Sequence, residues 1–316
     1  MDSQRSDERD VLVEVRGLRK RFGAIQAVDD VSFEVCRGEV LGFLGPNGAG
    51  KTTVMKMVTG FLEPDGGEVR IGGTDVARDP LGVKRRIGYL PENAPSYGEM
   101  TVESFLRFVA DARALQEPGR SLADVADKTG LGRVLPQTID TLSKGFRRRV
   151  GLAAALIHDP EVLILDEPTD GLDPNQKALV QELIRDLSSD KAIVLSTHIL
   201  DEAEKVCNRA MIISEGRLLV DSTPDALMKE AAGENVVRVE WAEEPDSEVI
   251  QSLKGLSWCE RVAKAPGHGI YLFPADGENH VRDVLQALEG QDVLGIHVRE
   301  GRLDDLFRDV TGGVCA

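Results

Sequence analysis

The stretch GPNGAGKTT, residues 45–53, constrains the fold of this chain more than any other feature. Four residues separate Gly45 from Gly50, and Lys51 and Thr52 follow directly. The apolar run EVLGFL precedes the stretch, and the apolar-periodic segment VMKMVTGFL follows it. A glycine-rich turn between a buried strand and a helix lets backbone N–H groups converge on phosphate oxygens. The sequence therefore predicts a phosphate-binding loop; the alternative is a glycine-rich turn that matches by chance.

The chemistry of such a loop assigns roles to particular side chains. Lys51 is expected to reach the β- and γ-phosphates of a nucleotide, and the Thr52 hydroxyl is expected to join a Mg²⁺ ion. In the run VLILDEP, Asp166 is placed to bind Mg²⁺ and Glu167 to polarise the water that attacks the γ-phosphate. The alternative for this run is a strand that merely ends in an acidic turn. The nucleotide-binding residues expected in the loop are Gly45, Pro46, Asn47, Gly48, Ala49, Gly50, Lys51, Thr52 and Thr53.

Composition limits the other partners of the chain. Its 316 residues carry a formal net charge of −16, which argues against general nucleic-acid binding because that needs a broad basic surface. No window approaches the roughly 18 apolar residues of a membrane span, and MDSQRSDERD lacks the apolar stretch of a signal peptide. The four cysteines form no C-x-x-C pair and are expected as reduced thiols in a cytosolic protein.

Strand and helix patterns predict an α/β core with a helical insertion. Residues 11 to about 72 indicate short strands separated by glycine-rich turns, and residues 95–158 are expected to be mostly helical. VLILDEP and AIVLSTH then indicate buried parallel strands, and RAMIISEGRLLV indicates a hairpin turned by EG. Beyond a boundary near residue 230, the order strand, helix, strand, strand, helix, strand predicts a ferredoxin-like unit.

The ordered set of motifs resembles the nucleotide-binding subunit of an ATP-binding-cassette (ABC) transporter, of the multidrug-export or gliding-motility type. GPNGAGKTT is followed by IGYLPEN, LSKGFRRRVGLAAAL, VLILDEPTDGLDP and STH at the family's spacing, and Ser143 precedes Asp166 by 23 residues. The resemblance covers residues 11 to about 230. It implies a P-loop ABC ATPase fold, in which an antiparallel β subdomain, a mixed α/β core and a helical insertion hold ATP and Mg²⁺.

The resemblance also implies an organisation and a location. The N-terminus, residues 1–10, is expected to be flexible; residues 11–230 form the ABC ATP-binding domain, with its helical subdomain at about 95–158; and residues 235–316 form the ferredoxin-like accessory domain. ATP hydrolysis would drive a separate transmembrane permease. The chain would then lie in the cytoplasm, peripherally on the cytoplasmic face of the inner or plasma membrane.

The basic stretch LSKGFRRRV takes the place of the family's signature sequence, usually LSGGQ. In the family two such subunits pair head to tail, and each signature caps the ATP on the partner's phosphate loop. The resemblance therefore implies ATP contacts for Ser143, Lys144 and Gly145, with Ser143 as the N-cap of a helix whose N-terminus attracts anions. The pair is either two copies of this chain or this chain with another ABC ATPase subunit. The arginines that follow lie along the same helix, and some are expected to pair with acids; a solvated basic helix face is the alternative.

Four further residues have family roles by resemblance. Glu92 in IGYLPEN takes the place of the glutamine that contacts Mg²⁺ and the attacking water; a carboxylate there either tightens Mg²⁺ binding or slows hydrolysis, and a surface acid is the alternative. His198 in STH matches the switch histidine that contacts the γ-phosphate. Asp173 in GLDP matches the loop that communicates across the dimer. Phe22 matches the aromatic residue that stacks on adenine, with a core phenylalanine as the alternative.

Two other functions stay open alongside the exporter subunit. A soluble, non-transport ABC ATPase that acts on ribosomes or DNA is disfavoured by the single cassette, the lack of a heptad run and the acidic charge. A slow-hydrolysing, nucleotide-dependent regulator is suggested by Glu92 and by the altered signature. The C-terminal unit contains no catalytic constellation: Trp258, Tyr271 and His280 are expected to pack or to lie at the surface, and the unit is expected to support the dimer or to regulate it.

Overall fold

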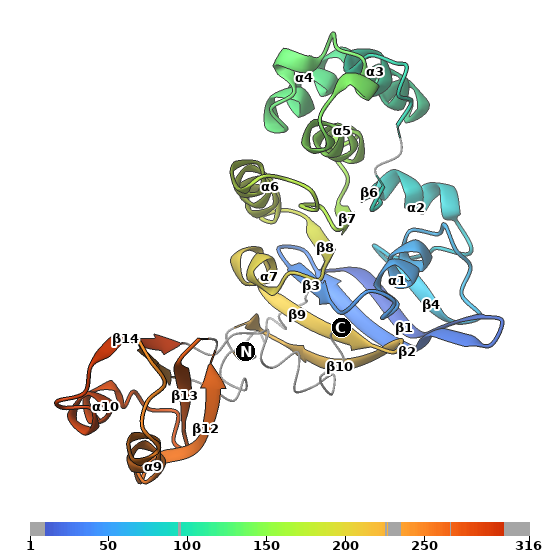
Figure 1. Ribbon diagram of the computed structural model, residues 1–316. Helices are drawn as coiled ribbons and strands as arrows, with labels where there is room; N and C mark the ends of the chain where they lie inside the picture. Colours follow the sequence, from blue (N-terminus) through green and yellow to red (C-terminus); the bar gives the residue numbers. More distant parts are fainter. Residues whose placement is uncertain (1–9, 94–95, 225, 227–234, 266, 300–316) are drawn as a thin grey trace, which may run out of the picture. The chain divides into compact units, whose positions relative to one another are not determined.

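The computed structural model describes residues 10–93, 96–224, 226, 235–265 and 267–299 of the chain. It divides into two compact units, with the boundary between Ser222 and Thr223 (Figure 1). The predicted boundary near residue 230, the first nine residues of the predicted flexible N-terminus and the tail GRLDDLFRDVTG lie outside the described residues.

An antiparallel sheet opens the first unit. In spatial order its strands are β2 (Ile25–Cys36), β1 (Val11–Phe22), β4 (Gly66–Ile71) and β5 (Thr74–Asp75). For these first two strands the sequence predicts the segments VLVEV and VSFEV, yet β1 and β2 continue beyond them as a long hairpin that closes at the Phe22–Ile25 pair. The polar ends of this hairpin stay extended because each strand provides the ladder hydrogen bonds of the other.

A six-stranded sheet forms the centre of the first unit. In spatial order its strands are β10 (Arg217–Ser222), β9 (Arg209–Ser214), β3 (Val40–Leu44), β8 (Ala192–Thr197), β7 (Val162–Asp166) and β6 (Ile87–Leu90). The strands from β9 to β6 pair in parallel, and β10 returns antiparallel to β9 as the predicted hairpin. Every residue of β3, β7 and β8 is buried, as their apolar runs predict.

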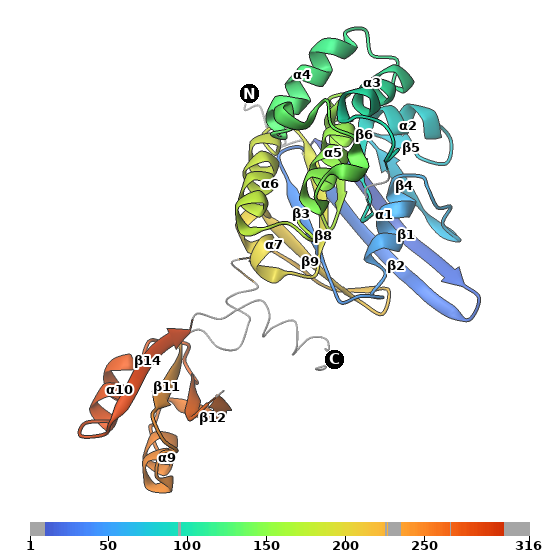
Figure 2. The same ribbon diagram turned by 45° about the horizontal axis from the view of Figure 1, so that its top comes forward.

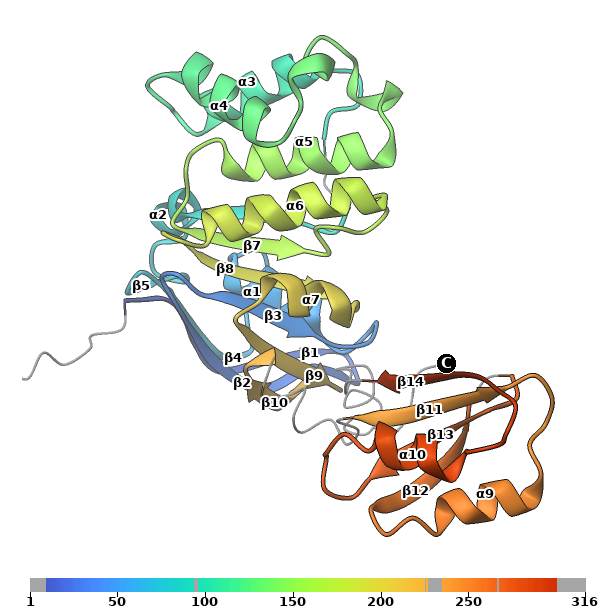
Figure 3. The ribbon, with the colours of Figure 1, turned by 90° about the vertical axis from the view of Figure 1, so that its left-hand side faces the viewer.

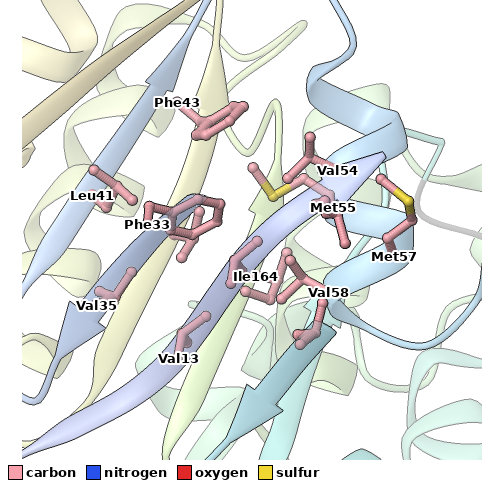
Figure 4. Packing of buried hydrophobic residues seen from close by; sticks show 14 of the residues in the cluster. Val13, Phe33, Val35, Leu41, Phe43, Val54, Met55, Met57, Val58 and Ile164 are labelled. Carbon is pink, nitrogen blue, oxygen red and sulfur yellow. The ribbon is translucent and has the colours of Figure 1, made fainter. Parts of the chain in front are cut away.

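Helix α1 (Lys51–Val58) is packed between the two sheets. It contacts β1, β2 and β4 of the antiparallel sheet and β7 of the parallel one. Figure 4 shows Val54, Met55 and Val58 pointing into a shared core with Phe43 and Ile164. On the other face of the parallel sheet lie α6 (Pro174–Leu187) and α7 (Leu200–Val206) (Figure 3). The helix that follows the glycine-rich stretch is therefore fixed on both sides.

The predicted helical region forms a separate layer of the first unit (Figure 2). Its elements are α3 (Val102–Ala112), α4 (Pro118–Lys128), the short 3₁₀ turns Gly132–Val134 and Ile139–Thr141, and α5 (Lys144–Leu156). These three helices contact one another, and α5 also contacts β6. Thr101 caps α3, because its hydroxyl accepts the N–H of Ser104 at 3.1 Å. Helix α2 (Pro80–Arg86) leads into β6.

The second unit has the predicted βαββαβ order. Its elements are β11 (Val236–Trp241), α9 (Ser247–Lys254), β12 (Cys259–Ala265), β13 (Gly269–Pro274), α10 (Val281–Ala287) and β14 (Val293–Arg299). Its antiparallel sheet has the order β12-β13-β11-β14, which is the strand order of a ferredoxin-like fold. The core includes Trp258, which stacks on the His280 ring with centroids 4.3 Å apart.

A buried histidine makes the stability of the first unit sensitive to acid. Burial, assisted by the charge of Arg113, lowers the pKa of His158 from 6.5 to about 4. Nε2 of His158 lies 3.0 Å from the carbonyl oxygen of Ile87, and Nδ1 is buried with no partner among the described residues. The unfolded chain therefore takes up a proton, at a pH where the folded chain does not.

We expect this histidine to make the first unit less stable below about pH 6.5. Because the folded pKa is depressed, the contribution is complete above pH 6.5 and is lost as the pH falls toward 4, by up to about 3 kcal/mol. Urea unfolding followed by far-UV circular dichroism from pH 7 to 4 measures this loss, and His158→Gln should reduce it.

The matched control is His268→Gln, because His268 is exposed in the second unit. Tryptophan fluorescence provides a second control, since Trp241 and Trp258 are the chain's two tryptophans and both lie in that unit. If the stability of His158→Gln fell equally steeply with decreasing pH, other titrating groups would be responsible for the acid sensitivity.

Candidate functional site

The phosphate-binding loop leads into α1 at a helix end that no side chain caps. Gly50 is the N-cap residue with φ 107°, in the left-handed region that favours glycine. A Cβ on Gly50 would collide with the carbonyl oxygen of Ala27, and one on Gly45 would collide with that of Ile213. Both positions therefore need glycine, and the first N–H groups of the helix are available to an anion.

Lys51 lies beneath this loop and is almost completely buried. Its Nζ donates to the carbonyl oxygens of Gly45 at 2.6 Å and Pro46 at 3.2 Å. Burial lowers the pKa of Lys51, and the nearby carboxylates of Glu167, Asp166 and Glu92 oppose that shift. The ammonium group is thus bound by carbonyl oxygens of the phosphate loop itself, and three carboxylates lie close enough to act on its charge.

A cavity of about 700 Å³ opens beside Lys51. It brings together segments that are far apart in the sequence: the start of β2, the glycine-rich loop and the loops that follow β6, β7, β8 and β9. Its lining residues are Ile25, Gln26, Ala27, Pro46, Asn47, Gly48, Gly50, Lys51, Thr52, Thr53, Glu92, Glu167, Asp170, His198 and Glu215. Most of the predicted nucleotide-binding residues therefore share one cavity; Gly45 and Ala49 belong to the same loop.

Asp166 has an orphaned acceptor at the end of β7. The side chain is completely buried, and its Oδ1 accepts a hydrogen bond from the Ser196 hydroxyl. Its Oδ2 has no hydrogen-bond partner among the described residues. A buried carboxylate oxygen without a donor fits a cation ligand. Thr52 and Glu92, the other predicted Mg²⁺ ligands, line the neighbouring cavity.

The described residues contain no group of three or more His, Cys, Asp or Glu side chains that could hold a metal by themselves. This arrangement suits Mg²⁺, which usually takes one or two carboxylates and completes its shell with substrate phosphates and water. The donor set therefore fits a metal that arrives with a nucleotide.

Glu167 and His198 are paired directly. Nδ1 of His198 lies 2.9 Å from Oε2 and 3.0 Å from Oε1 of Glu167, and the carboxylate is mostly buried. Glu167 has φ 52°, which non-glycine residues rarely adopt, and its N–H donates to the carbonyl oxygen of Ser196 at 3.1 Å. The sequence predicts separate roles for Glu167 and His198, whereas the structure makes them one hydrogen-bonded unit.

The signature residues lie at helix N-termini outside this cavity's lining. Ser143 caps α5 as predicted, with its hydroxyl accepting the Phe146 N–H at 3.3 Å. Lys144 forms an ion pair with Asp170 at 2.8 Å, and Asp173 caps α6. These residues and Gly145 are not among the described residues that line the nucleotide cavity of their own chain. Their predicted contact with a partner's nucleotide stays a prediction.

Among the described residues, none of the three arginines after the signature forms an ion pair with an acid, although some were expected to. Arg148 and Arg149 are both buried, and their side chains donate to backbone carbonyl oxygens. Only Arg147 of the three is exposed. The prediction failed because the helix directs two of these three adjacent side chains into the protein interior. Backbone carbonyl groups there have no partner in a helix or sheet and need hydrogen-bond donors.

Phe22, the predicted adenine platform, is 49% exposed at the end of β1, with Lys20 Nζ 5.8 Å from its ring centroid. Among the described residues it is Ile25, 69% exposed, that lines the cavity at this end. Asp170 and Glu215 also line the cavity and were missed by the sequence analysis. The EG turn with Glu215 was interpreted only as a hairpin connection, and nothing in its spacing indicates that Gly216 bonds to Ala49 of the loop.

Comparisons with known proteins identify relatives along the whole chain. The model of the ABC transporter family matches residues 28–170. Nod factor export ATP-binding protein I of Burkholderia lata is 34% identical over 309 residues, which cover 95% of this chain and 97% of that protein. Daunorubicin resistance ATP-binding protein DrrA3 of Streptomyces coeruleorubidus is 34% identical over 315 residues, covering 96% of each.

Solved structures agree with the fold of the first unit. An ATP-binding subunit of an ABC transporter superposes with a TM-score of 0.65 at 35% identity, over 69% of this chain and 92% of that chain. The protein cbiO1 from Clostridium perfringens, part of the transporter complex cbiONQ, gives 0.63 at 25% identity, over 70% and 92%. With relatives matched almost from end to end and the phosphate loop, Asp166 and Glu167 around one cavity, the chain belongs to the ATP-binding proteins of the ABC transporter family.

Proposed function

We propose that the chain is the ATP-binding and hydrolysing subunit that powers a membrane exporter. The observation that carries this proposal is the cavity where Lys51, Glu167 and His198 converge beside the phosphate loop. Relatives named for Nod factor export and daunorubicin resistance support the export direction. No helix among the described residues is long and apolar enough to cross a membrane. The proposal places the substrate path in a separate permease subunit.

ATP binding uses the loop and the start of α1. The uncapped N–H groups and the Lys51 ammonium bind the phosphates, and Lys51 exchanges its two loop carbonyl acceptors for phosphate oxygens. Thr52, Asp166 and Glu92 would hold Mg²⁺, which neutralises phosphate charge when bound. Ile25 and Gln26, which line the same cavity, would contact the base.

Hydrolysis uses the Glu167–His198 pair. The Glu167 carboxylate accepts a proton from the attacking water, and a positioned general base contributes about 10²–10⁴-fold to the rate. His198 keeps this carboxylate oriented by donating its Nδ1–H to it, and its Nε2 donates to the γ-phosphate when the imidazole carries both protons. Lys51 stabilises the negative charge that spreads over the phosphoryl oxygens.

Coupling to the permease requires a second subunit. The N-terminus of α5, with Ser143, Lys144 and Gly145, caps the ATP bound to the partner, and Asp173 lies at the same junction. Lys144 is free to exchange its exposed ion pair with Asp170 for a phosphate, because such surface pairs are worth little. ATP closes the dimer, hydrolysis reopens it, and the permease follows this movement.

Glu167→Gln is expected to keep ATP binding and to lose about 10²–10⁴-fold in turnover, because the amide cannot accept the water's proton. Steady-state phosphate release and binding of a fluorescent ATP analogue measure the two properties. Glu182→Gln, an exposed change on α6, is the control. Near-normal turnover in Glu167→Gln would refute the general base, and a wild-type rate as low as the variant's would favour the slow-hydrolysing regulator.

Asp166→Asn is expected to raise the Mg²⁺ concentration for half-maximal turnover by about tenfold or more, because the buried oxygen loses its charge. Binding of the ATP analogue without metal should change little. Titrating Mg²⁺ in the phosphate-release assay tests this, with the exposed Asp186→Asn as control. An unchanged Mg²⁺ requirement would remove Asp166 from the metal site.

Tagged Glu167→Gln protein, purified with ATP from gently solubilised membranes of its native host, is expected to bring a multi-spanning membrane protein in stoichiometric amount. The slow variant is used because it holds the ATP-bound state. Lys51→Ala should bring less of this protein, since it lacks the main phosphate contact. Recovery of ribosomal, DNA-bound or other soluble partners alone would keep the ATPase chemistry and exclude transport.

A further inference from the structure

Arg148 is a buried arginine that connects three functional segments. Its side chain is 5% exposed in α5, the helix that begins with the signature residues. An arginine carries five N–H donors, and here five backbone carbonyl oxygens lie within reach of them. Nη1 donates to Pro91 at 2.9 Å and to Glu92, Nη2 donates to Asp166 and Glu167, and Nε lies 3.5 Å from Pro168.

These acceptors belong to two loops of the site. One is the loop after β6 that carries Glu92, and the other is the end of β7 with Asp166 and Glu167. A planar guanidinium fixes the directions of its hydrogen bonds, so it holds both loops against α5 in one geometry. Arg148 does not belong to the described lining of the nucleotide cavity, which separates it from the groups that touch ATP.

The backbone conformation at Glu167 has to be fixed by its surroundings. Its φ of 52° lies in a region that a glutamate adopts only when the surroundings impose it. The peptide before it is held by the Glu167 N–H bond to Ser196 and by the bond from Arg148 to the Asp166 carbonyl oxygen. In the peptide after it, the Glu167 carbonyl oxygen accepts from Arg148 and, at 3.1 Å, from the Asp170 N–H. This conformation directs the carboxylate to His198. Loss of Arg148 therefore removes one hydrogen bond from each of these two peptides.

The charge of Arg148 also matches its surroundings. Burial lowers the pKa of its guanidinium, and the carboxylates of Asp166, Asp170, Glu167 and Glu92 oppose that shift. A guanidinium stays charged in proteins, so Arg148 places a fixed cation behind an acidic cluster.

We propose that Arg148 is a positioning residue for hydrolysis, which acts by fixing the backbone of Glu167 against the signature helix and the Glu92 loop. This inference rests on the proposed function, because it assigns a geometry to the general base of ATP hydrolysis. Arg148 itself touches neither ATP nor water in this role.

The adjacent arginine provides a matched control on the same helix. Arg149 is 7% exposed, and its Nη1 lies 3.3 Å from the carbonyl oxygens of Thr129 and Gly130. Its guanidinium carbon lies 4.1 Å from the ring centroid of Phe146. These contacts stay within the helical subdomain. A change at Arg149 therefore tests the loss of a buried guanidinium without the hold on Glu167.

The experiment compares Arg148→Lys with Arg149→Lys. Lysine keeps the charge but has three donors and no planar fork, so two carbonyl oxygens at position 148 lose their partner. Arg148→Lys is expected to lower kcat by roughly 10- to 100-fold, while KM and binding of the ATP analogue change by less than about threefold. Arg149→Lys should lose stability toward urea but keep kcat. A purely structural Arg148 would lose stability without this selective loss of kcat.

A double variant tests whether the effect passes through Glu167. If it does, Arg148→Lys should cause little further loss in a Glu167→Gln background, measured as single-turnover hydrolysis. A further loss as large as in the wild-type background would overturn the proposal. Should Arg148→Lys not give folded protein, Arg148→Gln, which keeps two donors for the carbonyl oxygens, takes its place with the same expectations.

Different results would contradict the proposed function and the role of Arg148. Wild-type protein that does not hydrolyse ATP, or that is unaffected by Glu167→Gln, contradicts the proposed function whatever happens at position 148. Normal hydrolysis that is lost in Glu167→Gln, together with equal kcat in Arg148→Lys and Arg149→Lys, overturns the role of Arg148 and leaves the proposed function intact.

Discussion

The site depends on the parallel pairing of β3, β8 and β7. In this register Leu44 lies opposite Thr197, and Asp166 lies opposite Ser196, so the three strands end at one edge of the sheet. The phosphate loop, Glu167 and His198 each follow directly from one of these strand ends. Segments more than a hundred residues apart in the sequence therefore meet without any long side chain having to bridge them.

This pairing also explains why charged groups are tolerated at the edge. The strands are fully buried, so Asp166 enters a region with little water, and Lys51 is covered by its own loop. A buried carboxylate oxygen without a donor costs free energy, of the order of a few kcal/mol for a polar group of this kind. The packing of α1 between two sheets supplies the stability that holds this unfavourable arrangement. A cation and a phosphate would relieve the cost when they bind.

The sequence predicted those parts of the fold and site that spacing along the chain determines. GPNGAGKTT, VLILDEP and STH each carry strand, turn and residue type in one short segment, and the structure brings Lys51, Glu167 and His198 together. The helical region and the βαββαβ order were predicted correctly because apolar periodicity reports local structure. The continuation of β1 and β2 was missed, because polar residues remain extended there only through their pairing with each other.

Arg148 illustrates the kind of contact that spacing cannot predict. LSKGFRRRV has the same local charge at three adjacent positions. Only helix packing decides that Arg147 is exposed, that Arg149 contacts the turn after α4 and that Arg148 contacts two loops. The acceptors of the Arg148 side chain are backbone carbonyl groups. Every residue type has this group, so no sequence pattern indicates the contact. The same applies to Glu215, which reaches the cavity only because the β9–β10 turn bonds to the phosphate loop.

The position of Arg148 gives the signature helix a second role. Ser143 and Arg148 are five positions apart on α5, which corresponds to roughly 7.5 Å along a helix of 1.5 Å rise per residue. On the proposed arrangement, the N-terminus of this helix contacts the partner's ATP while Arg148 holds the chain's own Glu167. Because a short helix segment is rigid, a shift that the partner's nucleotide imposed at Ser143 would be passed to the backbone of the proposed general base. The hydrolytic geometry of one cavity would then depend on whether the other is occupied, with no contact between the two nucleotides.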